Sequence, residues 1–437
     1  MKKRYIKELL IFVLVSMSLV GCVPSSDGEG SVSTAPPGTQ GTGDENPPTP
    51  TPAPTPAPEP TPGSARPGNG DDPPPTLGEI PTPDVIMPFD ENITAFELTK
   101  NMGAGWNLGN TLDAVLGANS PVSVTLQETS WGNPITTRDM IELLADTGFK
   151  TLRIPTTWER FIGPAPDYIL DESILDRVQE IVDWAFEFDM YVIINTHHER
   201  WNFPSSDNKA ALNILTALWH QIASRFAGYS EKLIFEAMNE PRMFDTDHEW
   251  TGGTTEARSV INGWNMYFIN TVRGTGYNNE KRFLMIPTHA ASADQNAIGD
   301  MWTPRNDDRV IVSLHAYTPY DIVLNTRLAR NTFDPNDFED TKEIDWLFER
   351  IDNRFISQGI AVVMGETGML NKDENHDARV AWADYYTSKA AALGIPCVWW
   401  DNGIRSTTNN EAFGLMHRQE NVWHHPEIAE AFIRNYR

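Results

Sequence analysis

The chain has 437 residues, more than one ordinary domain requires, and its 60 acidic against 34 basic residues give a net charge of −26. This balance excludes nucleic-acid binding as a main function, because nucleic-acid-binding proteins present a cationic face. Only two cysteines occur, so an exported domain must rely on a large apolar core and not on a disulfide framework.

The first 21 residues predict an export signal. A basic start precedes an apolar run from Leu9 to Val20, which is too short to cross a bilayer. The run ends in Leu-Val-Gly-Cys, which resembles a bacterial lipobox with Cys22 as the lipidated residue. We expect residues 1–21 to be a lipoprotein signal peptide and the mature chain to be an extracellular, cell-surface lipoprotein whose only membrane contact is this lipid anchor. A plain secretory signal is the alternative.

A linker is predicted next, over residues 22–88. It is rich in Pro, Thr, Gly and Ser, and the stretch 49–62 is nearly alternating proline. Such a composition cannot offset the ordering entropy of a packed core, and it favours extended polyproline II structure. We expect a disordered tether; a ligand for a proline-recognition module is the alternative.

Residues 89–437 predict a single catalytic domain of the α/β class, in which eight strands alternate with helices. The strands are expected at 103–108, 151–155, 191–197, 233–239, 283–287, 310–315, 361–366 and 396–400. The helices are expected at 138–147, 172–188, 208–226, 256–273, 290–298, 344–358, 377–393 and 426–435. This order predicts a (β/α)₈ TIM barrel with loop insertions. An open doubly wound sheet is the rival, but its dinucleotide fingerprint and phosphate-binding loop do not occur.

Two glutamates follow apolar runs at predicted strand ends. Leu233 to Met238 leads into Asn239 and Glu240, and a later run leads into Glu366. Because α/β barrels keep their chemistry at the carboxyl ends of the strands, the two carboxylates are expected to meet there. A carboxylate pair can split a glycosidic bond by acid catalysis and nucleophilic attack. The alternative is that each glutamate only caps the following helix.

Other polar residues are expected at the same barrel end. Arg153 lies in an apolar strand and needs a carboxylate partner, for which Glu366 is the candidate; a purely structural ion pair is the alternative. His315 and Tyr317 occupy alternate positions and point the same way, so Tyr317 could donate a hydrogen bond to Glu366. The pair His197-His198 suggests metal ligands or contacts to sugar hydroxyls. Metal catalysis is the less favoured of these two alternatives, because barrel metallohydrolases tend to use His-x-His.

Trp399 and Trp400 end the last predicted strand. One ring is expected to face the barrel mouth and stack on a sugar, and the other to lie in the core. Trp400 is favoured as the platform, on resemblance to known enzymes more than on physics. Motifs across the domain support that resemblance: Gly105-Trp-Asn-Leu-Gly-Asn-Thr-Leu-Asp113, Glu128-Thr-Ser-Trp-Gly-Asn133, Arg153, His197-His198, Asn239-Glu240-Pro241, His315-Ala-Tyr317, Gly365-Glu366-Thr367 and Trp400-Asp-Asn-Gly403.

With these motifs the chain resembles glycoside hydrolase family 5, the cellulase-A family, and in particular its bacterial endo-β-1,4-glucanase branch. The resemblance implies a retaining enzyme with Glu240 as acid/base and Glu366 as nucleophile. It further implies a set of substrate-binding residues: Asn107, Arg153, His197, His198, Asn239, His315, Tyr317, Trp399 and Trp400. We expect no metal and no other cofactor, a monomer, and plant cell-wall β-glucan polysaccharide as the partner.

For the mechanism we expect Glu240 to start protonated, with a pKa raised by burial and by the charge of Glu366. The carboxyl groups should lie about 5–5.5 Å apart, against about 6.5–9.5 Å in an inverting enzyme. Xyloglucan, mixed-linkage glucan or mannan is the alternative main substrate. A non-catalytic glycan-binding lipoprotein is the non-enzymatic alternative.

Overall fold

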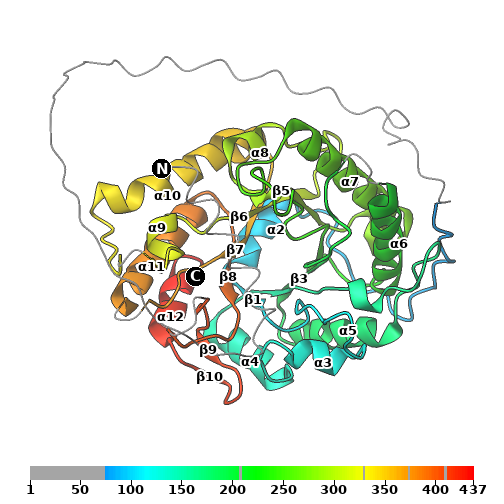
Figure 1. The fold of residues 1–437 in the computed structure, drawn as a ribbon, viewed down its shortest axis with the longest axis horizontal. Helices are drawn as coiled ribbons and strands as arrows, with labels where there is room; N and C mark the ends of the chain where they lie inside the picture. Colours follow the sequence, from blue (N-terminus) through cyan, green and yellow to red (C-terminus); the bar gives the residue numbers. More distant parts are fainter. Residues whose placement is uncertain (1–73, 206–208, 328–329, 373–374, 408–410) are drawn as a thin grey trace, which may run out of the picture. The chain divides into compact units, whose positions relative to one another are not determined.

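The computed structural model describes residues 74–437 apart from 206–208, 328–329, 373–374 and 408–410. The predicted signal peptide, Cys22 and most of the predicted linker lie outside the described residues. Eight parallel strands close into a barrel in chain order, and helices surround it (Figure 1). The predicted (β/α)₈ barrel is confirmed, and the open doubly wound sheet is wrong. The barrel strands are β1 (Gly105–Leu108), β2 (Thr151–Ile154), β3 (Tyr191–Asn195), β4 (Leu233–Glu236), β5 (Leu284–Ser292), β6 (Val310–His315), β7 (Val362–Thr367) and β8 (Cys397–Asp401).

Most of the predicted helices occur with ends shifted by a few residues. The helix predicted at 290–298 is largely wrong, because β5 continues to Ser292 and only Gln295–Gly299 is helical. Helix α4 matches the predicted range, because Thr137 caps its start by accepting a hydrogen bond from Met140 N and Gly148 ends it at φ 110°. The helices are α2 (Ala95–Met102), α3 (Val124–Thr129), α4 (Arg138–Thr147), α5 (Glu172–Glu187), α6 (Lys209–Arg225), α7 (Thr255–Gly274), α8 (Gln295–Gly299), α9 (Tyr320–Val323), α10 (Phe338–Arg354), α11 (His376–Ala392) and α12 (Pro426–Arg434).

Three short helices and a hairpin were not predicted from the sequence. Helices α2, α3 and α9 have 8, 6 and 4 residues, too few for a clear 3.6-residue period. The hairpin strands β9 (Met416–His417) and β10 (Val422–Trp423) pair antiparallel. Among the described residues, every helix is too short or too polar to span a bilayer.

The barrel interior changes from apolar to polar along the strands. At the amino ends, inward residues such as Ile193, Ile234 and Val363 form one buried cluster, which Leu98 and Met102 of α2 close from below. Side chains two positions further along each strand point the same way. There the interior is lined by polar, fully buried side chains: Asn107, Arg153, Asn195, Glu236 and Ser313. The strand register therefore builds a polar floor beneath the carboxyl-end opening.

Candidate active site

Arg153 forms the centre of this polar floor. Its side chain has no exposed surface, and its Nη1 donates to Glu366 Oε1 at 2.9 Å and to Asn107 Oδ1 at 2.9 Å. Its Nη2 donates to Asn239 Oδ1 at 2.8 Å, and its Nε donates to Glu236 Oε2 at 2.8 Å. The predicted Arg153–Glu366 pair is confirmed. A planar guanidinium with five donors can thus orient four side chains from three other strands, β1, β4 and β7, at once.

Glu236 is a site residue that sequence analysis missed. It is fully buried at the end of β4, where it accepts hydrogen bonds from Arg153, from Asn195 Nδ2 at 3.0 Å and from Ser313 Oγ at 2.5 Å. The sequence does contain a signal for Glu236, because a charged residue inside an apolar strand needs a partner. The same rule identified Arg153. The negative charge of Glu236 is what allows Arg153 to be buried beside Glu366.

Arg153→Met is expected to lower the free energy of unfolding by about 3–5 kcal/mol, because two carboxylates then lie buried without their counter-charge. Urea-induced unfolding followed by tryptophan fluorescence measures the loss. Arg200→Met is the control: Arg200 is 64% exposed where it pairs with Glu159, so its loss should cost about 1 kcal/mol or less. Equal losses in the two variants would contradict a central role for Arg153.

Glu366 is held by contacts on both carboxylate oxygens. Arg153 binds Oε1, and the Tyr317 hydroxyl donates to Oε2 at 3.1 Å, as predicted. Burial raises the pKa of Tyr317 well above its usual value, so the phenol stays a donor. Burial also raises the pKa of Glu366, against the lowering effect of the charges on His315 and Arg153.

The β7 strand is irregular around Glu366. Its register shifts where it pairs with β6 and with β8, so Glu366 faces the site instead of the outer side that strict alternation gives it. Gly365 makes this close packing possible, because a Cβ at that position would lie 3.0 Å from His315 Nε2. Asn107 Nδ2 donates to the Gly365 carbonyl at 2.9 Å and ties β1 to the bulge.

Glu240 lies across from Glu366 and is bonded to a histidine. His315 Nδ1 is 2.9 Å from Glu240 Oε1 and 3.7 Å from Glu366 Oε2. Burial raises the pKa of Glu240, but the His315 hydrogen bond and charge outweigh it and hold that pKa below its usual value. Burial lowers the pKa of His315, but the charges of Glu366 and Glu240 outweigh it and raise that pKa. The expected raised pKa of Glu240 is therefore wrong for the free protein, because the hydrogen bond and the charge of His315 favour the ionised carboxylate.

The two carboxylates are close enough to flank one bond. One oxygen of Glu240, one of Glu366 and a ring nitrogen of His315 all lie within 4.8 Å of one another. The Glu240 side chain is 15% exposed and that of Glu366 is 7% exposed, so both border the opening of the buried floor. Two carboxylate oxygens this close are compatible with the expected separation of about 5–5.5 Å between the carboxyl groups.

Two of the predicted substrate-binding residues lie beneath the site and not in it. Asn107 is fully buried. Its Oδ1 accepts a hydrogen bond from Arg153, and its Nδ2 donates to the Gly365 carbonyl and to two carbonyls of β8. Trp399 is also fully buried and donates from Nε1 to the Phe413 carbonyl. Asn107 positions Arg153, and Trp399 packs against Phe432 in the core, so a direct contact of these two residues with substrate stays a prediction.

The remaining predicted residues gather at the opening. Trp400 is half-buried and stacks parallel to His197, with ring centroids 5.8 Å apart. Of the two tryptophans, Trp400 is therefore the one that faces the barrel mouth. His198 packs edge-on against His197. Burial lowers the pKa of His197 well below its usual value and that of His198 to about 4, so both imidazoles are neutral near pH 7. Asn239 presents its Oδ1 to Arg153, which fixes the amide at the floor.

His197 and His198 are also the residues on which the alternative of a metal site depends. With Asp113 they offer ligand atoms within 4.8 Å of one another. However, the carboxylate oxygens of Asp113 already accept hydrogen bonds from the backbone nitrogens of Asn110 and Thr111. The absence of a metal requirement stays a prediction, to be checked by activity in a strong chelator.

A cleft of about 350 Å³ extends from His315 and Tyr317 toward α10. Two tryptophans, Trp250 and Trp346, lie in its walls, and their position in one cleft was not predicted from the sequence. Trp346 is 49% exposed. Trp250 lies in the loop before α7, whereas Trp346 is on α10.

The family model described as cellulase, glycosyl hydrolase family 5, matches residues 115–406. Endoglucanase B of Clostridium cellulovorans is 44% identical over 345 residues, which cover 78% of this chain and 76% of that protein. The cellulase/esterase CelE of Acetivibrio thermocellus is 42% identical over 80% of this chain; the chain spans 42% of its length, less than half.

Solved structures give the same result. A GH5-4 broad specificity endoglucanase from Ruminococcus champanellensis with bound cellotriose matches with a TM-score of 0.74 and 41% identity, over 78% of this chain and 99% of that one. XEG5A, a xyloglucan-specific endo-β-1,4-glucanase from a metagenomic library, matches with a TM-score of 0.72 and 40% identity, over 78% and 98%. The paired carboxylates on a (β/α)₈ barrel and these likenesses agree: the chain belongs to glycoside hydrolase family 5, the cellulase family.

Proposed function

We propose that this chain is a retaining endoglucanase that cleaves internal β-1,4-glucosidic bonds of cellulose or related β-glucans. The observation that carries the proposal is the facing pair of Glu240 and Glu366, with one oxygen of each within 4.8 Å. Each has its own partner, because His315 bonds Glu240 whereas Arg153 and Tyr317 bond Glu366.

The contacts support a double displacement. Glu366, oriented by Arg153 and Tyr317, attacks the anomeric carbon and forms an ester, while Glu240 protonates the departing glycosidic oxygen. Glu240, now ionised, then takes a proton from water, and the hydroxide that forms at the anomeric carbon releases Glu366 with retained configuration. The proton that Glu240 delivers comes from the hydrogen bond it shares with His315.

His315→Asn is expected to narrow the pH profile of kcat/KM. In the native protein, the proton shared by His315 and Glu240 is lost as the pH rises past the raised pKa of His315. Removal of the His315 side chain should therefore move the basic limb to lower pH. The positive charge of His315 lowers the pKa of Glu366, so its removal should also move the acid limb to higher pH. Initial rates on a soluble β-glucan from pH 4 to 9 measure both limbs; unchanged limbs would contradict proton sharing.

Substrate range is tested by one panel of polysaccharides: carboxymethylcellulose, lichenan, xyloglucan, xylan and glucomannan, read by reducing sugar. We expect the β-1,4-glucan substrates to be cleaved, with a rapid fall in viscosity that marks internal attack. Xyloglucan, mixed-linkage glucan or mannan as main substrate is the second candidate, and the likenesses to a xyloglucan-specific enzyme and to a lichenase support the first two of these. NMR of the first product should show the β-anomer; the α-anomer would exclude retention.

Trp346→Ala is expected to raise KM for a long β-glucan about fivefold and leave kcat little changed, because an exposed ring of the cleft wall can stack on a sugar. Trp184→Ala, on α5, is the matched control and should leave KM unchanged. Initial rates over a range of polysaccharide concentrations separate the two constants. Equal KM values for the two variants would remove Trp346 from the binding surface.

We also propose that the enzyme is a cell-surface lipoprotein anchored through Cys22 and held away from the membrane by the Pro/Thr-rich linker. The lipobox-like Leu-Val-Gly-Cys sequence and the polyproline stretch support this. Cys22→Ser should move the enzyme from the membrane fraction to the medium. Equal membrane retention of both forms would contradict lipid anchoring at this residue.

A further inference from the structure

Arg242 lies two residues beyond the proposed proton donor, in the loop that joins β4 to α7. Its Nη1 donates to the backbone carbonyl of Glu240 at 3.1 Å and lies 3.5 Å from Glu240 Oε2. The Arg242 side chain is 14% exposed and that of Glu240 is 15% exposed, so the pair is largely shielded from water. No role for Arg242 was predicted from the sequence. One guanidinium therefore meets both the main chain and the side chain of Glu240.

Glu249 fixes the orientation of this guanidinium. Its Oε1 accepts a hydrogen bond from Arg242 Nε at 3.0 Å, and its Oε2 accepts one from the backbone nitrogen of Asp245 at 3.1 Å. Glu249 is buried, so salt screens this ion pair little. A planar guanidinium that is held through both Nε and Nη1 cannot turn away from Glu240 without breaking one of these contacts.

The same guanidinium supports a wall of the cleft. Its carbon lies 4.7 Å from the centroid of the Trp250 ring, which is a cation–π contact. Trp250 lines the cleft together with His315 and Tyr317. The oxygen that Glu240 protonates belongs to the departing part of the glucan chain, so this part lies beside Glu240, where Arg242 also meets Trp250. Arg242 thus joins the proton donor to the leaving-group side of the cleft.

The charged and titratable groups that face Glu240 or Arg242 come from four strands or strand ends and from the loop itself: His198, Glu249, His289, His315, Tyr317 and Glu366. Burial raises the pKa of Glu240, whereas His315 and, after it, Arg242 lower that pKa. An arginine stays charged at every pH at which proteins are folded, so its effect on Glu240 is constant. The effect of His315 changes as the imidazole titrates.

We propose that Arg242 is a positioning residue of the glycosidase reaction, which holds Glu240 and Trp250 in a fixed relation so that the carboxyl group meets the departing oxygen of the sugar beside Trp250. A displacement of about 1 Å in a reacting group can cost about 10²-fold in rate, so a rigid link between the acid and the leaving-group side has a direct effect on turnover. This role rests on the proposed function and adds to it the residue that orients the departing sugar and the acid together.

Arg242→Met is expected to lower kcat/KM on a soluble β-glucan about tenfold or more, and kcat/KM on nitrophenyl β-cellobioside by less than about twofold. The glucan needs both a bound leaving sugar and a proton, whereas nitrophenolate departs without either. Loss of a merely structural contact lowers both rates together, so an unchanged ratio of the two constants would overturn the role of Arg242. A native protein that cleaves neither substrate would instead refute the proposed function.

The pH profile of kcat/KM on the β-glucan gives a second readout. Without the positive charge of Arg242, Glu240 keeps its proton to higher pH, so the basic limb of Arg242→Met should move to higher pH. Glu249→Gln retains the arginine and removes its counter-charge, so its basic limb should move to lower pH; this variant tests the role even if Arg242→Met does not fold. Basic limbs that stay unmoved, or a Glu249→Gln limb that moves to higher pH, would contradict the proposal.

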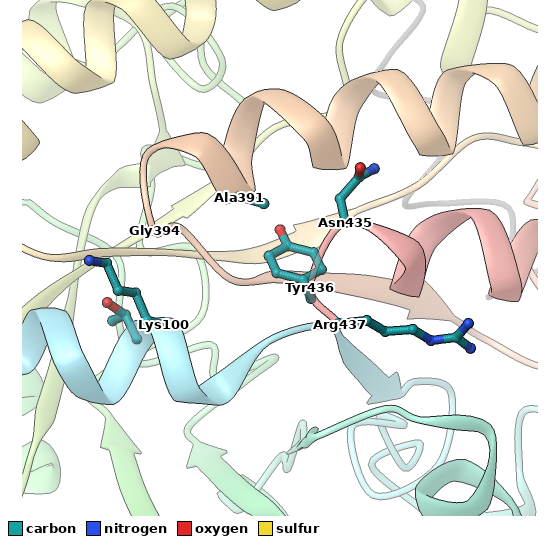
Figure 2. Close-up of a pocket in the computed structure, with 7 residues that line it drawn as sticks. Lys100, Ala391, Gly394, Asn435, Tyr436 and Arg437 are labelled. Atoms are coloured by element: carbon teal, nitrogen blue, oxygen red, sulfur yellow. The ribbon is translucent and has the colours of Figure 1, made fainter.

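Two control variants separate this role from loop order and from net charge. Arg258 supports the same loop, because its Nη1 donates to the carbonyls of Gly252 and Gly253 at 2.9 and 2.7 Å, but its ion pair is with Asp300. Lys100 lines a pocket of about 170 Å³ at the other end of the barrel, beside the C-terminal ends of α11 and α12 (Figure 2). Arg258→Met and Lys100→Met should keep the native ratio and the native basic limb.

Each control names a result that would overturn the proposal. If Arg258→Met reproduced the altered ratio of Arg242→Met, loop order alone would account for the loss. If Lys100→Met moved the basic limb as far as Arg242→Met, the change in net charge would account for the shift.

Discussion

The Glu366→Gln variant is expected to lose turnover of a soluble β-glucan by about 10⁴-fold or more and still bind cellotriose. The amide cannot form the glycosyl ester at a useful rate, because it is a far weaker nucleophile than a carboxylate. Its shape is nearly unchanged, so its oxygen can still accept hydrogen bonds from Arg153 and Tyr317, and the sugar-binding surface keeps its geometry. Steady-state rates give the loss in kcat, and isothermal titration with cellotriose gives the affinity.

Glu343→Gln is the matched control for that experiment. Glu343 lines the same cleft as His315 and Tyr317 but does not contact the carboxylate pair, so its kcat should remain within about threefold of the native value. If Glu366→Gln kept a kcat near that of Glu343→Gln, Glu366 would not be the nucleophile. If it instead lost cellotriose binding as well, the substitution would have disturbed the floor around Arg153.

The Glu240→Ala variant is expected to lose about 10³–10⁴-fold in kcat on polysaccharide and much less on an aryl β-cellobioside with a good leaving group. Polysaccharide cleavage needs a proton on the departing oxygen, whereas a nitrophenolate leaves without one. Added azide should then restore turnover of the aryl substrate by attacking the glycosyl ester, since Glu240 no longer repels an anion or activates water. Release of nitrophenol measures both effects.

The two substrates serve as each other's control in this variant. An equal loss on both would show that Glu240 contributes binding or stability and not the proton. A product of azide attack with the β-configuration is also expected, because the displacement from Glu366 inverts the centre a second time. An α-azide would contradict the double displacement while leaving the acid role of Glu240 intact.

The chain's own pattern located both glutamates before the structure was known. Each follows an apolar run at a strand end, and in a parallel barrel all such ends lie on one face, so their proximity follows from topology alone. The same reasoning placed Arg153 and Tyr317 correctly against Glu366, because a buried charge needs a partner and strand alternation fixes the direction of a side chain. Family resemblance, and not periodicity, supplied the roles of the two acids.

Some features could not be obtained in this way. Trp399 and Trp400 are adjacent and chemically identical. Only the structure shows that Trp399 packs against Phe432 of α12, whereas Trp400 stacks on His197. Asn107 belongs to a motif of the substrate site, yet the tertiary structure places it under Arg153. Glu366 faces inward only because β7 carries a register shift, which simple alternation does not predict.

Hydrophobic periodicity and local motifs are properties of short segments, so the barrel, the strand-end carboxylates and the family could all be predicted from the residues alone. The lowered pKa of Glu240 could not be predicted from the sequence. It depends on the distances among His315, Glu240 and Glu366, which lie on three different strands or strand ends, and on the burial they share. Electrostatic energies vary with separation and with solvent exposure, and neither is a property of any one segment of the chain.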